Sequence, residues 1–516
     1  MKGRMTPDSS LPAGASPSAP AARFAIPLAL GALLVALGLL LLRAGGVMPV
    51  LLWTDALVFL LLVVAAGYFL HVRRHGHLRA PWRRVTGSAA GLGSLAVLAA
   101  FLFIGLADCL HYRVLLPQKA GEAPAYSPEV LSVLDALTTR IRSRSERTYS
   151  APLAMRAYSR ETVELPGGRQ AREFPRLAFG GAHLKDDADH KRDVLIVAVR
   201  GLAAGFLLWW LIAGFAALVI ARSEGRRMRD AWNRIWRRET PVPWIAVFVV
   251  LGALFALAGP VVSLAGKYHV LGTDKVGQDV LYLSLKSIRT SLVIGTLTTL
   301  VLLPVAVTLG IAAGYLKGWV DDAIQYLYTT LNSIPSVLLI AAAVLMVQGY
   351  IDAHPELFPT AAQRADLRLL FLCVILGLTS WTGLARLLRG EALKLRELEF
   401  VQAAQAFGVG RGRILSRHLL PNVMHIVLIS LVMDFSGFVL AEAALSYVGV
   451  GVDPGMISFG TMINAARLEM AREPMVWWAL AAAFVFMFVL VLAANLFADA
   501  VRDAFDPRVR VGRTAA

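Results

Sequence analysis

The sequence has very little cysteine and no nucleotide-binding motif. Only Cys109 and Cys373 occur among 516 residues, far apart and without a CxxC pattern, which excludes a disulfide framework and gives no indication of a zinc site. No G-x-x-x-x-G-K-[ST] sequence occurs, so the chain has no P-loop. If this protein moves a solute uphill, another chain or an ion gradient must supply the energy.

Residue patterns for catalysis are also missing. An intramembrane enzyme would need an HExxH, Ser/His or paired-aspartate arrangement. The nearest candidates, His425 and Asp434, are nine residues apart and have no nucleophile beside them. We therefore predict no catalytic residue and no metal site.

Apolar residues and positive charge are abundant instead. Hydrophobic residues make up 57% of the chain, and the formal net charge is +16. The apolar runs reach the ~20 residues needed to cross a bilayer, and the arginines cluster beside them. This is the positive-inside pattern of a polytopic membrane protein, so a lipid bilayer is the expected partner and nucleic acid is not.

The apolar runs predict about ten transmembrane helices in an all-α membrane protein. They lie near 25–42, 51–70, 88–108, 194–221, 243–264, 291–313, 323–347, 369–388, 423–448 and 476–498.

The orientation of the spans follows from the arginine-rich segments 71–84, 222–238 and 386–417, which ten spans place on one side. We expect this side, with both termini, to be cytoplasmic. The hydrophilic stretch 109–193 should then be a small extracytoplasmic domain. Within it, ETVEL before Pro-Gly-Gly at 166–168 predicts a β-turn element.

The sequence EFVQAAQAFGVGRGRILSRHLLPN at 399–422 lies between two spans. Its periodicity predicts two short helices with a hinge at Gly408. Ala403, Ala404 and Ala406 permit close approach of another surface. An amphipathic loop at the membrane interface is the alternative interpretation.

This spacing, QAA-x-x-x-G, then nine residues, then H-x-L-P, resembles the EAA loop of ABC importer permeases. Gln402 stands where that pattern has Glu, and His418 where it has Ile. The resemblance implies a coupling helix that docks in a cleft of a separate ATPase subunit. The residues that match the motif are Gln402, Ala403, Ala404, Gly408, His418, Leu420 and Pro421.

The sequence HVLGTDKVGQDVLYLSL at 269–285 should form an extracytoplasmic turn, with Thr273 or Asp274 capping the following helix. It is similar to the H-x-LGTD-x-x-GRD-V segment of dipeptide and oligopeptide importer permeases, with Gln278 in place of Arg. Either the turn is purely structural, or it contacts a binding protein or a partner permease. The residues concerned are Gly272, Thr273, Asp274, Gly277 and Asp279.

Segments 313–322, 441–463 and 500–508 resemble the same branch, so the resemblance covers roughly 267–510. It implies a six-helix type I permease core preceded by four added helices. The expected layout is a disordered cytoplasmic tail at 1–22, three added helices at 23–108, the extracytoplasmic domain at 109–193, a fourth added helix and basic loop at 194–242, and the core at 243–510 with its coupling loop at 390–421.

Two acidic residues lie inside the ninth expected span, where a charge costs roughly 2.5–3.5 kcal/mol on insertion scales. Asp434 and Glu442 fall near one helix face. They either line a path for the positive end of a peptide or form polar contacts between helices. Asp55, in the second expected span, should pair with another added helix.

The DppC/OppC-like resemblance implies one of two membrane subunits of an ATP-driven peptide importer in the bacterial inner membrane. The implied partners are a second homologous permease, two ATPase subunits that bind ATP and Mg, and an extracytoplasmic binding protein; this chain itself needs no cofactor. Nickel or another small solute is the alternative cargo. A self-sufficient secondary transporter is the alternative class, although no internal inverted repeat is evident.

Overall fold

The computed structural model describes residues 47–505 except 117–124, 166–168, 224, 226, 238, 241, 355 and 357–359. Among the described residues, eight helices are long and apolar enough to cross a membrane, and one bent helix pair makes a ninth. Each of the other nine expected spans overlaps one of these, while the span expected near 25–42 lies outside the described residues. The prediction of an all-α protein with many spans is confirmed.

The first half of the chain contains most of the small elements. In order they are β1 (Val47–Val50), α2 (Trp53–Arg74), α3 (Gly76–Gly87), α4 (Ala89–Cys109), β2 (His111–Val114), β3 (Leu131–Ser132), α5 (Val133–Leu137), α6 (Thr139–Arg142), β4 (Glu161–Leu165), β5 (Arg169–Glu173), the short 3₁₀ turn Asp187–Asp189, α7 (His190–Ser223) and α8 (Met228–Trp236).

The second half is helical throughout. It consists of α9 (Trp244–Ala265), α10 (Val280–Leu316), α11 (Trp319–Ser333), α12 (Ser336–Ala353), α13 (Ala361–Ser380), α14 (Thr382–Arg396), α15 (Glu399–Ala406), α16 (Arg411–Ile414), a π-helical turn at Leu415–Leu419, α17 (Leu420–Val448), α18 (Phe459–Glu469) and α19 (Trp478–Phe505).

Two expected spans are broken, which corrects the prediction of single helices there. The run at 323–347 is divided between α11 and α12 at Ile334 and Pro335, because proline has no N–H to donate and restricts the residue before it. The run at 369–388 bends by 40° at Trp381, between α13 and α14. Hydropathy reports only that a segment is apolar, so it does not detect these breaks.

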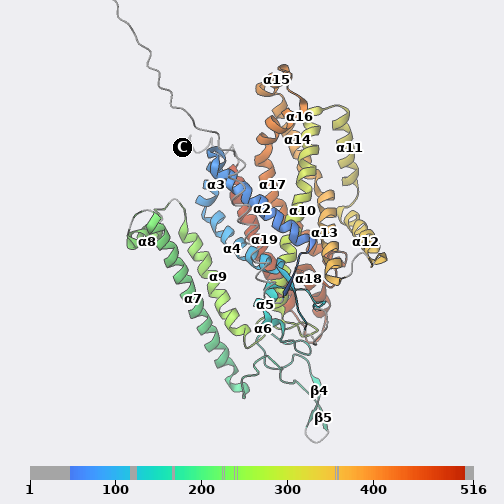
Figure 1. The fold of residues 1–516 in the computed structure, drawn as a ribbon. Helices are drawn as coiled ribbons and strands as arrows, with labels where there is room; N and C mark the ends of the chain where they lie inside the picture. The colour runs from blue at the N-terminus through green and yellow to red at the C-terminus, as the bar shows by residue number, and fades with distance from the viewer. Residues whose placement is uncertain are drawn as a thin grey trace, which may run out of the picture.

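The centre of the molecule is α10, which packs against α4, α13, α14 and α17 (Figure 1). Its buried face includes the large apolar residues Ile288, Ile294, Leu297 and Leu302, which are almost inaccessible to solvent. The same face also buries Arg289 and several Ser and Thr side chains. Burial of such side chains stabilises by about 1.5–3 kcal/mol each in a soluble protein, while inside a bilayer close packing has the larger share. The added helices α2 and α4 therefore lie directly on the central helix.

Helix α9, the span that precedes the LGTD segment, packs mainly against α7 and α4. The α7–α9 pair is held partly by Trp209, whose Nε1 donates to the carbonyl oxygen of Phe248 at 2.7 Å. In Figure 1 this green pair stands beside α4, to the left of the helices around α10.

Two small sheets are built from the region between α4 and α7, and β1, which precedes α2, is added to the first of them. Strands β1, β2 and β3 form an antiparallel sheet, and β4 pairs with β5 as a hairpin. The predicted β-turn element at ETVEL is therefore confirmed, although the turn residues 166–168 lie outside the described residues. The hairpin is at the opposite end of the molecule from α3, α15 and α16 (Figure 1).

Candidate functional site

The helix α15 has one buried and one exposed side. Val401 and Ala404, three residues apart, are buried in the apolar core, whereas Gln402 and Ala403 are exposed. An α-helix completes a turn every 3.6 residues, so residues three or four apart lie on the same side and the residues between them face the other way. Ala404, predicted to permit the approach of another chain, is instead covered by this chain, and Ala403 is accessible.

The predicted hinge is a left-handed turn at Gly408. Its φ angle is +73°, and no atom outside its chain neighbours lies within 4 Å of where a Cβ would be. The amide of Val409 donates to the carbonyl oxygen of Ala404 at 3.0 Å, which closes the end of the helix in the way that glycine commonly does. Phe407, which was not among the predicted site residues, precedes the hinge and is 86% exposed.

The chain returns to the membrane-spanning helices through α16 and the π-helical turn at Leu415–Leu419. Helix α17 then begins at Leu420, with Pro421 in its first turn, as predicted. His418 is half-buried, and its ring centroid lies 6.3 Å from that of Phe400 in α15. Asn422 Nδ2 donates to the carbonyl oxygen of His418 at 2.6 Å, which satisfies an acceptor in the irregular turn.

Polar contacts connect α15 to the end of the central helix. Gln405 Nε2 donates to the hydroxyl of Tyr315 at 3.2 Å, and Arg396 Nη1 donates to the carbonyl oxygen of the same tyrosine at 2.9 Å. Lys317 and Glu397 are 3.4 Å apart across the two segments. These contacts join α15 and the residues directly before it to the C-terminal end of α10.

The helix that follows the LGTD turn is capped by a different residue from those predicted. Asp279 Oδ1 accepts from the amides of Leu281 at 2.8 Å and Tyr282 at 3.4 Å, so Asp279 is the N-cap of α10. Asp274 Oδ1 accepts from the amide of Gln278 inside the turn at 2.8 Å. The prediction that Thr273 or Asp274 caps this helix is therefore wrong, because Asp279 is the residue directly before the helix.

The turn is covered by this chain's own residues 146–150. Thr273 Oγ1 donates to the carbonyl oxygen of Thr148 at 2.9 Å and accepts from the amide of Ser150 at 2.6 Å. Gly277 has a φ angle of +78°, and a Cβ there would lie 1.9 Å from the carbonyl oxygen of Glu146. Only glycine permits this contact. Gly272, Thr273 and Gly277 are all buried within the chain.

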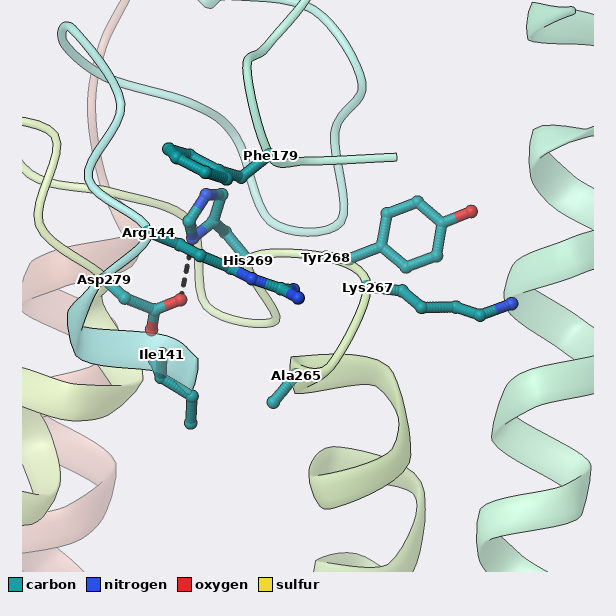
Figure 2. A pocket seen from close by; sticks show the side chains of 8 residues that line it. All are labelled: Ile141, Arg144, Phe179, Ala265, Lys267, Tyr268, His269 and Asp279. Atoms are coloured by element: carbon teal, nitrogen blue, oxygen red, sulfur yellow. Dashed lines mark hydrogen bonds and ion pairs between the residues drawn. The ribbon is translucent and has the colours of Figure 1, made fainter. Parts of the chain in front are cut away.

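His269 joins the turn to segment 146–180, which lies over it. Figure 2 shows its ring beside Phe179, with the hydrogen bond to Asp279, and Tyr268 and Lys267 directed away from it. His269 Nδ1 is 2.8 Å from Asp279 Oδ2 and Nε2 is 3.3 Å from Glu146 Oε1. Burial lowers the pKa of His269, but the hydrogen bonds to these two carboxylates outweigh it and raise the pKa to about 9.

Glu146 is the common acceptor of this cluster. Burial raises its pKa, but hydrogen bonds from His269 and from the amides of Phe179, Ala178 and Gly180 lower it to about 2. The carboxylate thereby holds segment 178–180 against the turn.

The two acidic residues of α17 have different surroundings. Glu442 is 1% exposed and accepts from the hydroxyls of Ser446 at 2.7 Å and Ser458 at 2.9 Å. It therefore ties α17 to the segment that caps α18, a polar contact of the kind that the helix-contact interpretation expects. Asp434 is half-buried, and its carboxylate has no hydrogen-bond or ion-pair partner among the described residues.

Asp55 pairs with the central helix, where an added helix was predicted. Arg289 Nη2 of α10 lies 2.6 Å from Asp55 Oδ1, and His111 Nδ1 lies 2.8 Å from Oδ2. Asp366 of α13 accepts hydrogen bonds from the amide of Thr54, at 3.1 Å, and from the hydroxyl of Thr54. The first turn of α2 thus bridges α10 and α13 through fully buried charges.

A second ion pair lies one turn away on α10. Lys286 Nζ is 2.9 Å from Asp108 Oδ1 and 3.0 Å from Asp135 Oδ2. Neither Lys286 nor Arg289 was predicted as a contact residue. The sequence did contain an indication, because two basic residues three positions apart directly before an apolar run require acidic partners, and Asp55 and Asp108 are the acidic residues that border the second and third spans.

Comparisons with known proteins agree with the resemblance. A family model described as "Binding-protein-dependent transport system inner membrane component" matches residues 306–511. The oligopeptide transport system permease protein OppC of Mycobacterium tuberculosis H37Rv is 33% identical over 245 residues, which cover 48% of this chain and 78% of the relative. The glutathione transport system permease protein GsiD of Pectobacterium atrosepticum is 29% identical over 327 residues, with 58% and 99% covered.

Two further matches are more distant. The dipeptide transport system permease protein DppC of Bacillus subtilis is 27% identical over 296 residues, covering 55% of this chain and 86% of the relative. Among solved structures, the methionine ABC transporter MetNI in inward-facing conformations matches 43% of this chain and 97% of its own, at 14% identity and a TM-score of 0.32. The structural match is too distant to support an argument.

Family membership establishes the general role of the chain. It is a multi-pass inner membrane protein and the non-catalytic membrane subunit of an ABC importer of the peptide and glutathione class, and it binds no cofactor itself. Such a system includes an ATPase and a binding protein. The chain therefore belongs to the binding-protein-dependent ABC importer permeases, in the OppC- and DppC-like peptide permease family.

Proposed function

We propose that this chain is one of two homologous permeases of a peptide importer and that α15 is the helix that docks on an ATPase subunit. The observation that carries the proposal is the exposed side of α15 with Phe407 at its tip. A large exposed aromatic side chain on a polar loop is typical of a contact with another protein. Val401 and Ala404 hold the opposite side of the helix in the core.

The orientation of the molecule supports this assignment. The basic segments α3, α8 and α14–α16 are directed toward the end opposite β4 and β5 (Figure 1). The positive-inside rule makes that end cytoplasmic, which is where an ATPase subunit would be. The region 109–193, which includes β4 and β5, would then be extracytoplasmic.

Peptide cargo is supported by the names of the relatives, which refer to oligopeptides, dipeptides and glutathione. On the transport path, Asp434 is the better of the two predicted acidic residues, since Glu442 has its own partners. A half-buried carboxylate without a partner in one subunit should face water or a second permease in the assembled transporter.

Segment 146–180, which covers the LGTD turn, is the proposed contact for the binding protein. The LGTD turn is buried under residues 146–150, so a binding protein that approaches from outside would meet the segment that covers the turn. Crosslinkers at the exposed Arg160 and Arg172 should capture a binding protein in an active complex; capture of no partner chain would remove this contact from the proposal.

The proposed function is tested by affinity purification of the chain in mild detergent. We expect an ATPase, a second permease and a binding protein to co-purify, and peptides to stimulate ATP hydrolysis in the reconstituted complex. Co-purification with a nickel-binding protein, or stimulation by nickel and not by peptides, would contradict the peptide assignment.

A further inference from the structure

An unusually basic surface lies where α2 meets α3. We call it the basic corner and define it as Arg73, Arg74, Arg79, Arg83 and Arg84, all of which are exposed. No Asp or Glu occurs in the sequence between Asp55 and Asp108. By contrast, the basic loop at 222–239 contains three acidic residues among seven arginines.

The corner is held in one orientation by the apolar side of α3. Val85 is 2% exposed and packs with Val501 and Ala504 in the last turns of α19. The ring of Trp82 meets that of Phe505 edge-on, at 5.4 Å between centroids. Because these contacts occupy one side of the helix, Arg79, Arg83 and Arg84 are left on its outer side.

The arginines of α3 repel one another in the absence of an anion. Arg79 and Arg83 are four residues apart on a helix, a spacing at which like charges are neighbours and destabilise it. Among the described residues, no carboxylate forms an ion pair with Arg79, Arg83 or Arg84. An anion from outside the chain would relieve this repulsion.

The position of the corner identifies the source of that anion. It lies directly between two membrane spans, since α2 ends at Arg74 and α4 begins at Ala89. Trp82, beside the arginines, is a residue type that is enriched at the membrane interface. Basic residues on an amphipathic helix next to a span attract anionic lipid headgroups.

We propose that the basic corner is a binding site for the phosphate headgroups of anionic phospholipids. The headgroups neutralise the arginines and thereby keep α3 packed against the end of α19. The site is separate from α15 and does not depend on the proposed coupling role.

The test is native mass spectrometry of the purified full-length chain with dioleoyl phosphatidylglycerol, dioleoyl phosphatidylcholine or inorganic phosphate. We expect phosphatidylglycerol adducts to be preferred over phosphatidylcholine adducts. The triple variant Arg79→Gln, Arg83→Gln, Arg84→Gln should bind phosphatidylglycerol about tenfold or more weakly. The matched control, Arg227→Gln, Arg229→Gln, Arg237→Gln, removes the same charge elsewhere and should bind as the wild type does.

Replacement of the same three arginines by lysine keeps the charge and should preserve binding, which separates charge loss from misfolding. Equal adducts with both lipids, or unchanged binding in the glutamine variant, would overturn the proposal. Displacement of phosphatidylglycerol by millimolar inorganic phosphate would assign the site to free phosphate and would also overturn it.

Discussion

At the scale of single residues, accessibility decides which alanine of the coupling loop can contact a partner. We expect Ala403→Asp, on the exposed side of α15, to leave the protein folded and to abolish peptide-stimulated ATP hydrolysis. Ala404→Asp should instead destabilise the loop, because it places a charge among Val401, Ile414 and Leu419. Thermal unfolding and ATPase activity of the reconstituted complex, measured for both variants, distinguish the two effects.

Identical behaviour of the two variants would contradict this assignment. If both lost stability, α15 would have no free side. If both stayed stable and coupled, neither alanine would face the ATPase.

His269 makes its cluster with Asp279 and Glu146 sensitive to pH. Its pKa is raised from 6.5 in the unfolded chain to about 9, so its contribution to stability is complete below pH 6.5 and is lost as pH rises through 9. The lowered pKa of Glu146 acts in the acidic range, where stability is lost as pH falls from 4.5 toward 2. Wild type should therefore exceed His269→Gln in unfolding temperature at pH 6, and the difference should shrink by pH 10. A difference in unfolding temperature that stays constant from pH 6 to pH 10 would contradict a stabilising role for the ionisation of His269.

The sequence predicted residues that local spacing defines and missed those that tertiary packing defines. Gly408 and Pro421 could be assigned because a hinge and a helix start have recognisable residue types. Phe407 could not, since the exposure of one side chain depends on where α15 packs. The capping role of Asp279 was also missed, because Thr273, Asp274 and Asp279 are all residue types that can cap a helix.

At the scale of elements, the first turn of α2 is a bridge between two helices of the permease core. Asp55 binds Arg289 of α10, while Thr54 binds Asp366 of α13. Removal of one partner from a buried ion pair typically costs 3–5 kcal/mol. We expect Asp55→Asn to lower the stability of the purified chain by about 3 kcal/mol, measured by unfolding in mild detergent.

Asp434→Asn is the matched control for this prediction, because it removes a carboxylate from a span where no partner is present among the described residues. It should leave the stability nearly unchanged. A loss of stability as large in Asp434→Asn as in Asp55→Asn would mean that the α2 bridge has no special role.

Span positions were predictable at this scale, because a helix that crosses a bilayer must be apolar along its length. The break at Pro335 has a local cause that the sequence displays. The bend at Trp381 has none, since it depends on how α13 and α14 pack on α10.

At the scale of the whole molecule, the added helices α2 and α4 pack directly against the permease core. The core helices α10 and α13 present Lys286, Arg289 and Asp366, each of which has a buried partner within residues 54–135. Arg289 and Asp366 also pair with each other, at 3.6 Å. The apolar character of the described spans followed from composition, whereas this dependence could not be predicted, because it joins charges more than 150 residues apart. The added region therefore completes the fold of the permease.

In the proposed assembly, Phe407 contacts the ATPase subunit. This contact is tested most directly by photocrosslinking from p-benzoylphenylalanine at position 407 in the reconstituted, transporting complex, with the same probe at Phe174, in the segment 146–180, as the control. We predict that the probe at 407 captures the ATPase and that the probe at 174 does not. Capture of only lipid or the binding protein from position 407, in a complex that still imports peptide, would contradict the account.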